Sequence, residues 1–228
     1  MIGAQTRLVA ILGHPVAHSL SPVMQNAAFA ARGLDWAYVA LDVSPARLGD
    51  AVRGLAAAGF VGANVTAPHK LAVAELCDDR NADSVNTLVF DNGRVVGTST
   101  DAAVLEGLDA TSPAIVGDGG AARAFQVALP GARRFSRRGD WPPDLGSADL
   151  VVHATPVRDR PLFELRPGQT LVDLPYPDSA TAAAARAAGA NVIDGFEVLV
   201  AQGAASFECW TGVRAPLEVM RAAVRREP

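Results

Sequence analysis

The apolar residues of the first half of the chain alternate between short continuous runs and stretches with helical spacing. Leu8–Leu12 is an apolar run with β-branched members that ends at a Gly-His-Pro turn, which predicts a buried strand. Pro22–Arg32 shows helical spacing and stops at Gly33, and Trp36–Asp42 predicts a second strand followed by a helix over residues 45–58. This order of strands and helices predicts an α/β fold with a parallel sheet.

The same pattern continues up to a polar break at Thr111-Ser112-Pro113. A hairpin is predicted around Asn92-Gly93, because this dipeptide favours a tight turn between strands. The other elements predicted here are a strand over 60–65, a helix over 70–77, strands over 84–90 and 94–97, and a helix over 102–108. We therefore predict a first domain of residues 1–110, a second of residues 111–200, and a C-terminal helical segment, 201–228, that packs back on the first.

The second domain has the pattern of a compact Rossmann-type dinucleotide-binding unit, with strands and helices that again alternate. Its predicted strands are 114–116, 134–136, 150–153, 170–174 and 191–193, and its predicted helices run from the glycines at 117–120 to Leu129 and over 180–188. The C-terminal helices are predicted over 197–207 and 216–225. The predicted fold class is thus an N-terminal α/β domain joined to a Rossmann-type domain.

The amino-acid composition and net charge indicate which kinds of partner and cellular compartment this chain suits. Half of the 228 residues are hydrophobic and 19% are charged, which is typical of soluble globular proteins. The net charge of −4 and the lack of a basic cluster argue against a nucleic-acid partner. Cys77 and Cys209 lie far apart without CxxC spacing, so we expect no zinc site, no other metal and no disulfide framework, but a reducing cytoplasm. The first apolar run is too short for a signal peptide or a membrane span.

A glycine cluster, Gly117-x-Gly119-Gly120, lies between a predicted strand and a predicted helix. Glycines there allow close backbone approach, and a helix N-terminus offers free N–H groups to a pyrophosphate. The cluster departs from G-x-G-x-x-G because its sixth position is not a glycine, so an ordinary glycine-rich turn is the alternative.

The end of the next strand is where dinucleotide-binding proteins contact the adenosine ribose. Arg137 and Arg138 stand there in place of an acidic residue, which favours a 2′-phosphate and hence NADP over NAD. The alternative is that these arginines, with Arg133 and Arg134, form a solvated basic edge.

Two polar clusters in the first half suggest a binding site. Ser19 and Ser21 precede a predicted helix N-terminus and could cradle a carboxylate, although Ser21 could instead be only the N-cap of that helix. Asn64 and Thr66 alternate at the end of a strand, and Lys70 begins a helix. A lysine there opposes the helix dipole, so its presence favours a functional role such as proton transfer.

These motifs resemble those of the shikimate dehydrogenase family. The shared blocks are GHPVAHSLSP at 13–22, NVTAPHK at 64–70, VNT at 85–87, Thr100-Asp101, the glycine loop at 117–124, ATP at 154–156, and Gln202 followed by FExWTG at 207–212. The resemblance covers nearly the whole chain. It implies reversible NADPH-dependent reduction of 3-dehydroshikimate to shikimate in aromatic amino-acid biosynthesis.

The resemblance also implies roles for particular residues. Lys70 and Asp101 would be the catalytic pair, and Ser19 and Ser21 would bind the substrate carboxylate. The residues that would bind the ring hydroxyls are Asn64, Thr66, Asn86 and Gln202. The residues that would bind NADP are Gly117, Gly119, Gly120, Ala121, Ser136, Arg137, Arg138, Thr155 and Gly195.

The sequence departs from the family pattern chiefly on the cofactor side. Asp118 places a carboxylate beside the expected pyrophosphate, and Arg158 and Val198 replace a glycine and a methionine. Residues 139–149 contain Pro142 and Pro143, so a loop should replace the usual crossover helix. The alternatives are a quinate or aminoshikimate dehydrogenase, or a shikimate-binding protein with reduced cofactor use; the protein could be a monomer or a homodimer.

Overall fold

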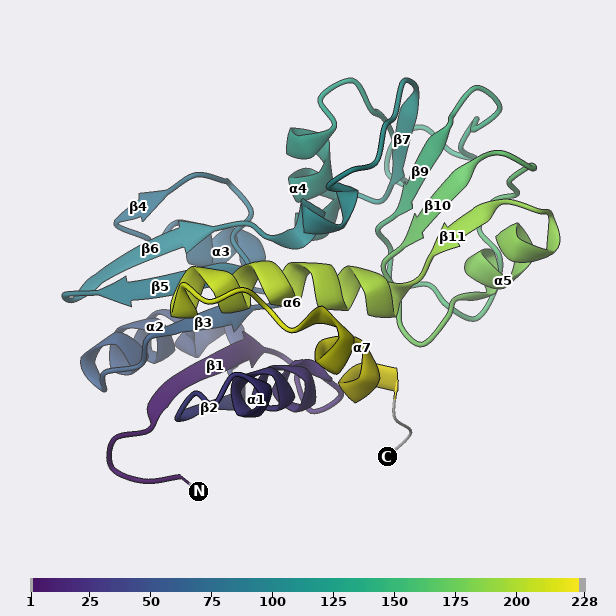
Figure 1. Cartoon of the computed structure of the whole chain (residues 1–228). Coiled ribbons are helices and arrows are strands. Elements are labelled where there is room, and N and C mark those ends of the chain that lie inside the picture. Colours follow the sequence, from purple (N-terminus) through teal and green to yellow (C-terminus); the bar gives the residue numbers. More distant parts are fainter. Residues whose placement is uncertain (1, 226–228) are drawn as a thin grey trace. The chain divides into compact units, whose positions relative to one another are not determined.

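The computed structural model describes residues 2–225, which form two compact units (Figure 1). The first unit runs to Thr100 and resumes at Val200, and the second comprises Asp101–Leu199. This division falls ten residues before the predicted boundary at 110, because Val104, Leu105 and Leu108 pack into the core of the second unit. The α/β fold class is confirmed.

The first unit is built around a six-stranded sheet in the order β2-β1-β3-β5-β6-β4. Its elements are β1 (Arg7–Gly13), α1 (Ser21–Ala31), β2 (Trp36–Asp42), α2 (Leu48–Ala57), β3 (Gly62–Val65), α3 (Lys70–Ala74), β4 (Asp79–Arg80), β5 (Thr87–Asp91), β6 (Arg94–Thr98) and α7 (Leu217–Arg225). The sheet is mixed: β1 pairs in parallel with β2 and β3, as the order of strands and helices predicts, whereas β5 is antiparallel to both β3 and β6. The predicted hairpin makes β6 antiparallel to β5, and Asn92 and Gly93 at its turn both have positive φ.

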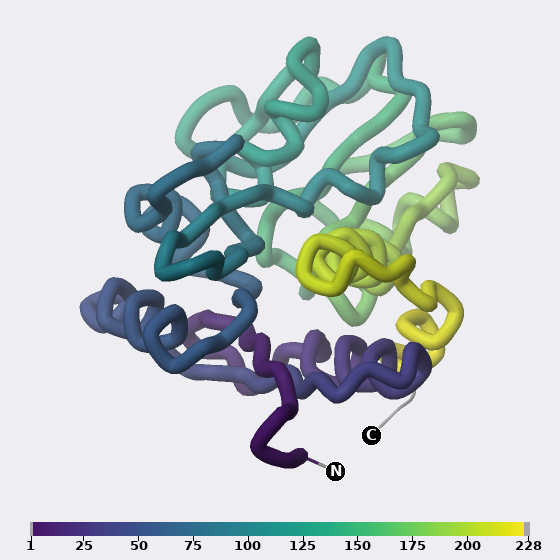
Figure 2. Tube along the Cα trace, turned by 60° about the vertical axis from the view of Figure 1, so that its left-hand side comes forward, coloured from purple at the N-terminus to yellow at the C-terminus, as the bar shows by residue number. Residues whose placement is uncertain are grey.

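Both faces of this sheet are covered because side chains alternate along each strand. Ala10 and Leu12 of β1 join a core with residues of α2 and α3. On α1, Phe29 stacks on Phe207 of the helix α6 (Gly195–Thr211), with ring centroids 5.3 Å apart. Helix α7 packs beside α1, as both views show (Figures 1 and 2). The predicted return of the C-terminal segment to the first unit thus has a physical basis in apolar burial.

The helical predictions differ from the structure mainly at the ends of elements. The predicted helix over 45–58 begins as a 3₁₀ turn, Pro45–Arg47, before α2. The predicted helix over 102–108 is a 3₁₀ segment, Asp101–Leu105. Within residues 2–225, every helix is too short or too polar to cross a bilayer.

The second unit has a five-stranded, fully parallel sheet in the order β11-β10-β9-β7-β8. Its elements are β7 (Pro113–Val116), α4 (Gly120–Ala128), β8 (Arg133–Phe135), β9 (Leu150–His153), β10 (Thr170–Asp173), α5 (Ala180–Ala187) and β11 (Asn191–Ile193). After β8 the chain crosses to the far side of β7, so the strand order reverses between β7 and β9. In open α/β sheets this is the place where ligands bind.

A loop crosses from β8 to β9, as the two prolines predict, and the described chain forms no helix between these strands. Leu145 and Ala148 of this loop enter the core of the unit in its place. The buried Gln169 side chain fastens the loop, because its Nε2 donates to the carbonyl oxygens of Leu145 (2.9 Å) and Ala148 (2.6 Å). The loop is therefore a packed part of the unit.

Asp149 fastens the start of β7 to the same loop. Its carboxylate accepts hydrogen bonds from the hydroxyl and N–H of Thr111, both at 2.6 Å, and from the N–H of Ser112 at 3.0 Å. Desolvation raises the pKa of Asp149, but these hydrogen bonds and one from the Leu150 N–H outweigh it, so the pKa lies below its usual value.

Candidate functional site

A buried network of polar side chains lies around the inner strands β3 and β5 of the sheet in the first unit. Asn64, near the end of β3, donates from Nδ2 to the Asn86 carbonyl (3.0 Å), to Thr87 Oγ1 (3.1 Å) and to Ser206 Oγ (2.9 Å). Its Oδ1 accepts from the Tyr38 hydroxyl at 2.8 Å. The Asn64 side chain thus uses both its donor and its acceptor groups, which fixes its orientation.

Asn86 extends this network to Thr100 and Gln202. Its Oδ1 accepts from the Thr100 N–H at 2.8 Å, and its Nδ2 donates to Thr100 Oγ1 at 3.0 Å and, more weakly, to Gln202 Oε1 at 3.5 Å. The structure therefore brings together three of the predicted substrate-binding residues, Asn64, Asn86 and Gln202. Asn64 and Asn86 are buried, whereas Gln202 is half-buried.

Sequence reasoning missed the residues that hold this network in place. Ser206 is fully buried, contacts the hydroxyls of Thr87 (2.9 Å) and Thr100 (3.2 Å), and donates to the Gln202 carbonyl at 3.0 Å. A signal existed in its spacing: Ser206 follows Gln202 by one helical turn, so both lie on one face of α6. Tyr38 gave no such signal, because only the sheet brings it to Asn64.

Ser19 and Ser21 behave differently from the predicted N-cap arrangement. Helix α1 begins at Ser21 itself, with Leu20 as its N-cap, so the alternative that Ser21 caps the helix is wrong. The capping-type contact is made by Ser19, whose Oγ accepts from the Ser21 N–H at 3.3 Å. The reason is that the chain turns into helical backbone angles one residue earlier than a serine cap would require.

The loops that carry Ser19 and Thr66 follow neighbouring parallel strands. The Thr66 N–H donates to the Leu12 carbonyl at 2.9 Å, and the His14 N–H donates to the Ala67 carbonyl at 3.2 Å. Thr66 is half-buried. The loops after β1 and β3 are thereby held at the same end of the sheet, where the carboxyl ends of parallel strands commonly form sites.

Lys70 and Asp101 lie in different compact units. Lys70 is the half-buried first residue of α3, directly after His69, whose Nε2 contacts the Val43 carbonyl at 2.7 Å. Asp101 is buried and begins the 3₁₀ segment at the start of the second unit. Their assignment as a catalytic pair remains a prediction.

The second unit holds a cavity of about 230 Å³ at the strand-order reversal. Six of its lining residues are Gly117, Asp118, Ser136, Arg137, Arg138 and Thr155. Five of these were predicted to bind the cofactor, and the structure gathers them around one space. The sixth, Asp118, contributes the carboxylate noted as a departure from the family pattern.

The glycine turn explains how this cavity forms. Gly117 has a φ of +143°, and a Cβ there would lie 2.4 Å from the Ala154 carbonyl oxygen, so only glycine fits between β7 and β9. Gly119 is the N-cap of α4, and Gly120 and Ala121 are its first residues. The first N–H groups of a helix have no partners within the helix, which suits them to a phosphate.

Gly119, Gly120, Ala121 and Gly195 are not among the residues that line the cavity itself. Gly195 is buried at the start of α6, where a Cβ would lie 2.1 Å from the Pro175 carbonyl oxygen. The close approach of the Pro175 backbone therefore explains why residue 195 is a glycine.

The four arginines at positions 133, 134, 137 and 138 differ in their surroundings, and Arg134 is exposed. Arg137 and Arg138 line the cavity. Arg133 instead donates to Ser147 Oγ at 2.9 Å and lies over the Phe135 ring. Arg138 also pairs with Asp118 at 3.6 Å, and because Arg138 is 90% exposed, this pair is weak. Two arginines thus remain positioned for a phosphate.

The first unit holds a buried network of polar side chains, and the second holds a glycine turn of the dinucleotide-binding type. Together they define the class of two-domain, nucleotide-dependent α/β enzymes. A family model for the shikimate dehydrogenase substrate binding domain matches residues 11–88, and one for the shikimate 5′-dehydrogenase C-terminal domain matches residues 195–225. A protein of Methanopyrus kandleri named shikimate dehydrogenase (NADP(+)) is 40% identical, with 98% of this chain and 96% of that protein covered. The chain belongs to the shikimate dehydrogenase family.

Solved structures similar to this chain include a shikimate and a quinate dehydrogenase. The structure of shikimate 5-dehydrogenase from Thermus thermophilus in complex with NADP(H) and shikimate is 31% identical, with a TM-score of 0.86 over 96% of this chain and 99% of that one. Quinate dehydrogenase from Corynebacterium glutamicum in complex with NAD is 25% identical, with a TM-score of 0.80 over 96% of this chain and 98% of that one. The alignment with the Methanopyrus protein spans 279 positions, so that relative carries segments that this 228-residue chain lacks.

Proposed function

We propose that this chain is an NADP-dependent shikimate dehydrogenase, which reversibly reduces 3-dehydroshikimate to shikimate in aromatic amino-acid biosynthesis. The observation that carries this proposal is the near-complete alignment with relatives named shikimate dehydrogenase (NADP(+)). The polar network of the first unit supports it, because a polyhydroxylated ring requires several fixed hydrogen-bonding side chains.

The substrate is bound by the first unit in this proposal. Ser19 and Ser21 donate their hydroxyls to the carboxylate, beside the N-terminus of the 11-residue helix α1. Asn64, Thr66, Asn86 and Gln202 bind the ring hydroxyls. Ser206 and Tyr38 keep Asn64 oriented through their hydrogen bonds to it, and Thr100 does the same for Asn86, so little ordering is needed on binding.

Lys70 and Asp101 move the proton in this proposal. Reduction of the ketone carbon builds negative charge on its oxygen, and the Lys70 ammonium stabilises this charge and donates a proton to that oxygen. In the reverse direction Lys70 accepts the proton of the shikimate hydroxyl, and Asp101 is the second member of the proposed catalytic pair. Such general acid–base catalysis contributes typically about 10²- to 10⁴-fold to the rate.

The residues of the second unit fit NADP. Gly117 and the N-terminus of α4 offer a close, electropositive backbone for the pyrophosphate, and Arg137 and Arg138 at the cavity suit the 2′-phosphate. When bound, the nicotinamide supplies or accepts the hydride. The Asp118 carboxylate opposes this fit and is partly neutralised by Arg138.

The test is an assay of the purified protein for shikimate-dependent reduction of NADP⁺, followed at 340 nm as the absorbance of NADPH. Parallel reactions with quinate and with NAD⁺ separate the alternatives. Turnover that is fastest with shikimate and NADP⁺ supports the proposal. Faster turnover of quinate would assign the chain to that substrate, and no turnover with any pair at millimolar substrate would contradict the enzyme assignment.

We further propose a cytoplasmic location and a monomer or homodimer. Cys77 and Cys209 are free cysteines, which agrees with a reducing compartment. Cell fractionation tests the compartment, and light scattering on the purified protein measures the oligomeric state.

A further inference from the structure

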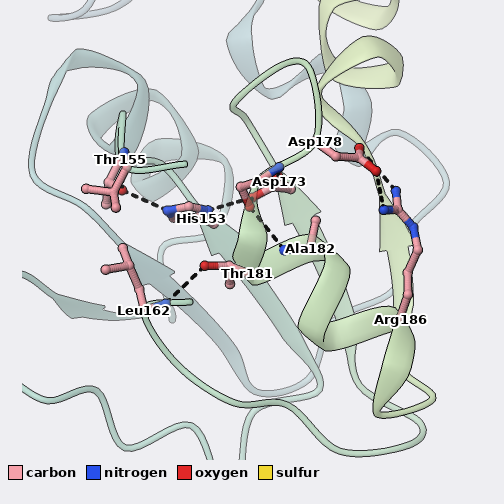
Figure 3. A network of polar contacts seen from close by, with 10 residues as sticks. His153, Thr155, Leu162, Asp173, Asp178, Thr181, Ala182 and Arg186 are labelled. Atoms are coloured by element: carbon pink, nitrogen blue, oxygen red, sulfur yellow. Dashed lines mark hydrogen bonds and ion pairs between the residues drawn. The ribbon is translucent and has the colours of Figure 1, made fainter. Parts of the chain in front are cut away.

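A buried histidine and a buried aspartate lie beside the dinucleotide cavity of the second unit. His153 ends β9 and Asp173 ends β10, and the parallel register places the two residues opposite each other. His153 Nδ1 lies 2.5 Å from Asp173 Oδ1, and both side chains are fully buried (Figure 3). The resemblance to the family assigned neither residue a role.

The hydrogen bonds around Asp173 determine which imidazole nitrogen carries a proton. The Ser179 hydroxyl donates to Asp173 Oδ1 at 3.0 Å, and Ser179 in turn accepts from the Ala182 N–H at the start of α5. Ser179 therefore acts as a donor to the Asp173 carboxylate, because a buried carboxylate needs hydrogen-bond donors. The remaining short contact of this carboxylate requires a hydrogen on Nδ1 of His153, which leaves Nε2 for another partner.

That partner is the hydroxyl of Thr155, a residue that lines the cavity. His153 Nε2 lies 2.7 Å from Thr155 Oγ1, so with a neutral imidazole the threonine hydroxyl donates to Nε2 (Figure 3). The Thr155 oxygen also accepts weakly from the Val157 N–H at 3.3 Å. One acceptor position of this oxygen remains, and it suits a ligand group that donates a hydrogen bond.

We propose that His153 and Asp173 are positioning residues that hold the Thr155 hydroxyl as an acceptor for the adenosine half of NADP. This inference depends on the proposed function. The adenosine half is assigned because Thr155 shares its cavity with Arg137 and Arg138. A phosphate oxygen cannot donate to Thr155, so the matching group is a ribose hydroxyl or the adenine amine.

Binding of NADP⁺ and of adenosine 2′,5′-bisphosphate, measured by calorimetry, tests the contact. We expect Thr155→Val to raise the Kd of both ligands about fivefold to tenfold, because one hydrogen bond is lost. Thr155→Ser keeps the hydroxyl and should stay within about twofold of wild type. KM for NADP⁺ should rise in parallel with Kd, while kcat at saturating NADP⁺ changes little.

Thr111→Val is a matched control in the same unit. It also removes a threonine hydroxyl that makes a short hydrogen bond, in this case at 2.6 Å to Asp149, but Thr111 does not line the cavity. This control should lower thermal stability and leave both Kd values unchanged.

A double-mutant cycle tests the role of His153. His153→Gln should weaken binding about as much as Thr155→Val, and the double variant should bind no more weakly than Thr155→Val alone, because His153 acts through the threonine. Additive losses would overturn the positioning role. If His153→Gln does not fold, Asp173→Asn takes its place in the cycle. Should neither fold, the comparison of Thr155→Val with Thr155→Ser still decides the contact.

The outcomes separate this inference from the proposed function. Failure of the wild-type protein to bind NADP⁺ would contradict the proposed function. Wild-type binding together with an unchanged Kd in Thr155→Val would overturn the inference alone. Weakened binding of NADP⁺ but not of the bisphosphate would also overturn it, since the contact would then lie outside the adenosine half.

Discussion

Ser206→Ala is the sharpest perturbation of the substrate-binding network. The Ser206 hydroxyl contacts Asn64, Thr87 and Thr100 at 2.9, 2.9 and 3.2 Å, and donates to the Gln202 carbonyl. The substitution leaves each of these side chains at least one other hydrogen-bond partner. Asn64, for example, keeps its hydrogen bond to the Asn86 carbonyl. We therefore expect a loss of about 1 to 2 kcal/mol in the free energy of unfolding, as for one buried hydrogen-bonding group.

The functional consequence follows because Asn64 loses one of the hydrogen bonds that orient its side chain. KM for shikimate should rise several-fold, whereas KM for NADP⁺ should stay unchanged, because the network belongs to the first unit. Denaturant unfolding measures the free energy, and initial rates with each substrate varied in turn measure the two KM values.

Thr211→Ala is the matched control on the same helix. Thr211 Oγ1 donates to the Phe207 carbonyl at 2.8 Å, the same bond to the preceding turn that Ser206 makes, but Thr211 contacts none of the network residues in the interactions described. It should lower stability without an effect on KM for shikimate. Equal KM values for the wild type and Ser206→Ala would refute the argument that Ser206 orients the site.

Three further predictions address the other parts of the site. Lys70→Ala should lower kcat at least about 100-fold while shikimate still binds by calorimetry, and near-normal kcat would exclude Lys70 as the proton donor. Asp118→Asn should lower KM for NADP⁺ by removing a carboxylate beside the cofactor cavity. This decrease in KM should be smaller at high salt, because salt screens the repulsion between the carboxylate and the cofactor phosphates. A raised KM would contradict that repulsion. Asp149→Asn should lower the free energy of unfolding at neutral pH. Because folding lowers the pKa of Asp149, the greater stability of the wild type should disappear as the pH falls below the ordinary pKa of 3.8. A stability difference that persists at lower pH in denaturant unfolding would contradict the stabilising role of the ionised carboxylate.

Local signals in the sequence predicted much of the fold. Asn92-Gly93 predicted the β5–β6 hairpin, and the glycines after Val116 predicted a turn that only glycine fits at Gly117. Pro142 and Pro143 predicted a crossover without a helix. These features depend on the backbone preferences of a few neighbouring residues, so they can be recognised without the rest of the chain.

The same reasoning failed where neighbouring segments compete. The order of strands and helices predicts parallel pairing, which holds for β1, β2 and β3, but it does not predict that β5 pairs antiparallel with β3. Ser21 was considered as an N-cap, yet helix α1 begins at that residue. Strand pairing and the exact start of a helix depend on packing partners that lie outside the local window.

The α/β order, the glycine turn, the helix-free crossover and, through its motifs, the family can all be recognised in the amino-acid sequence. The contact of Ser206 with Asn64 across 142 positions of the chain, and those of His153 with Asp173 and Thr155, exist only in the folded unit. The physical reason is that turn and helix preferences act between close neighbours in the sequence. A buried hydrogen bond instead requires donor and acceptor to meet within about 3 Å, and the packing of the whole unit sets that meeting.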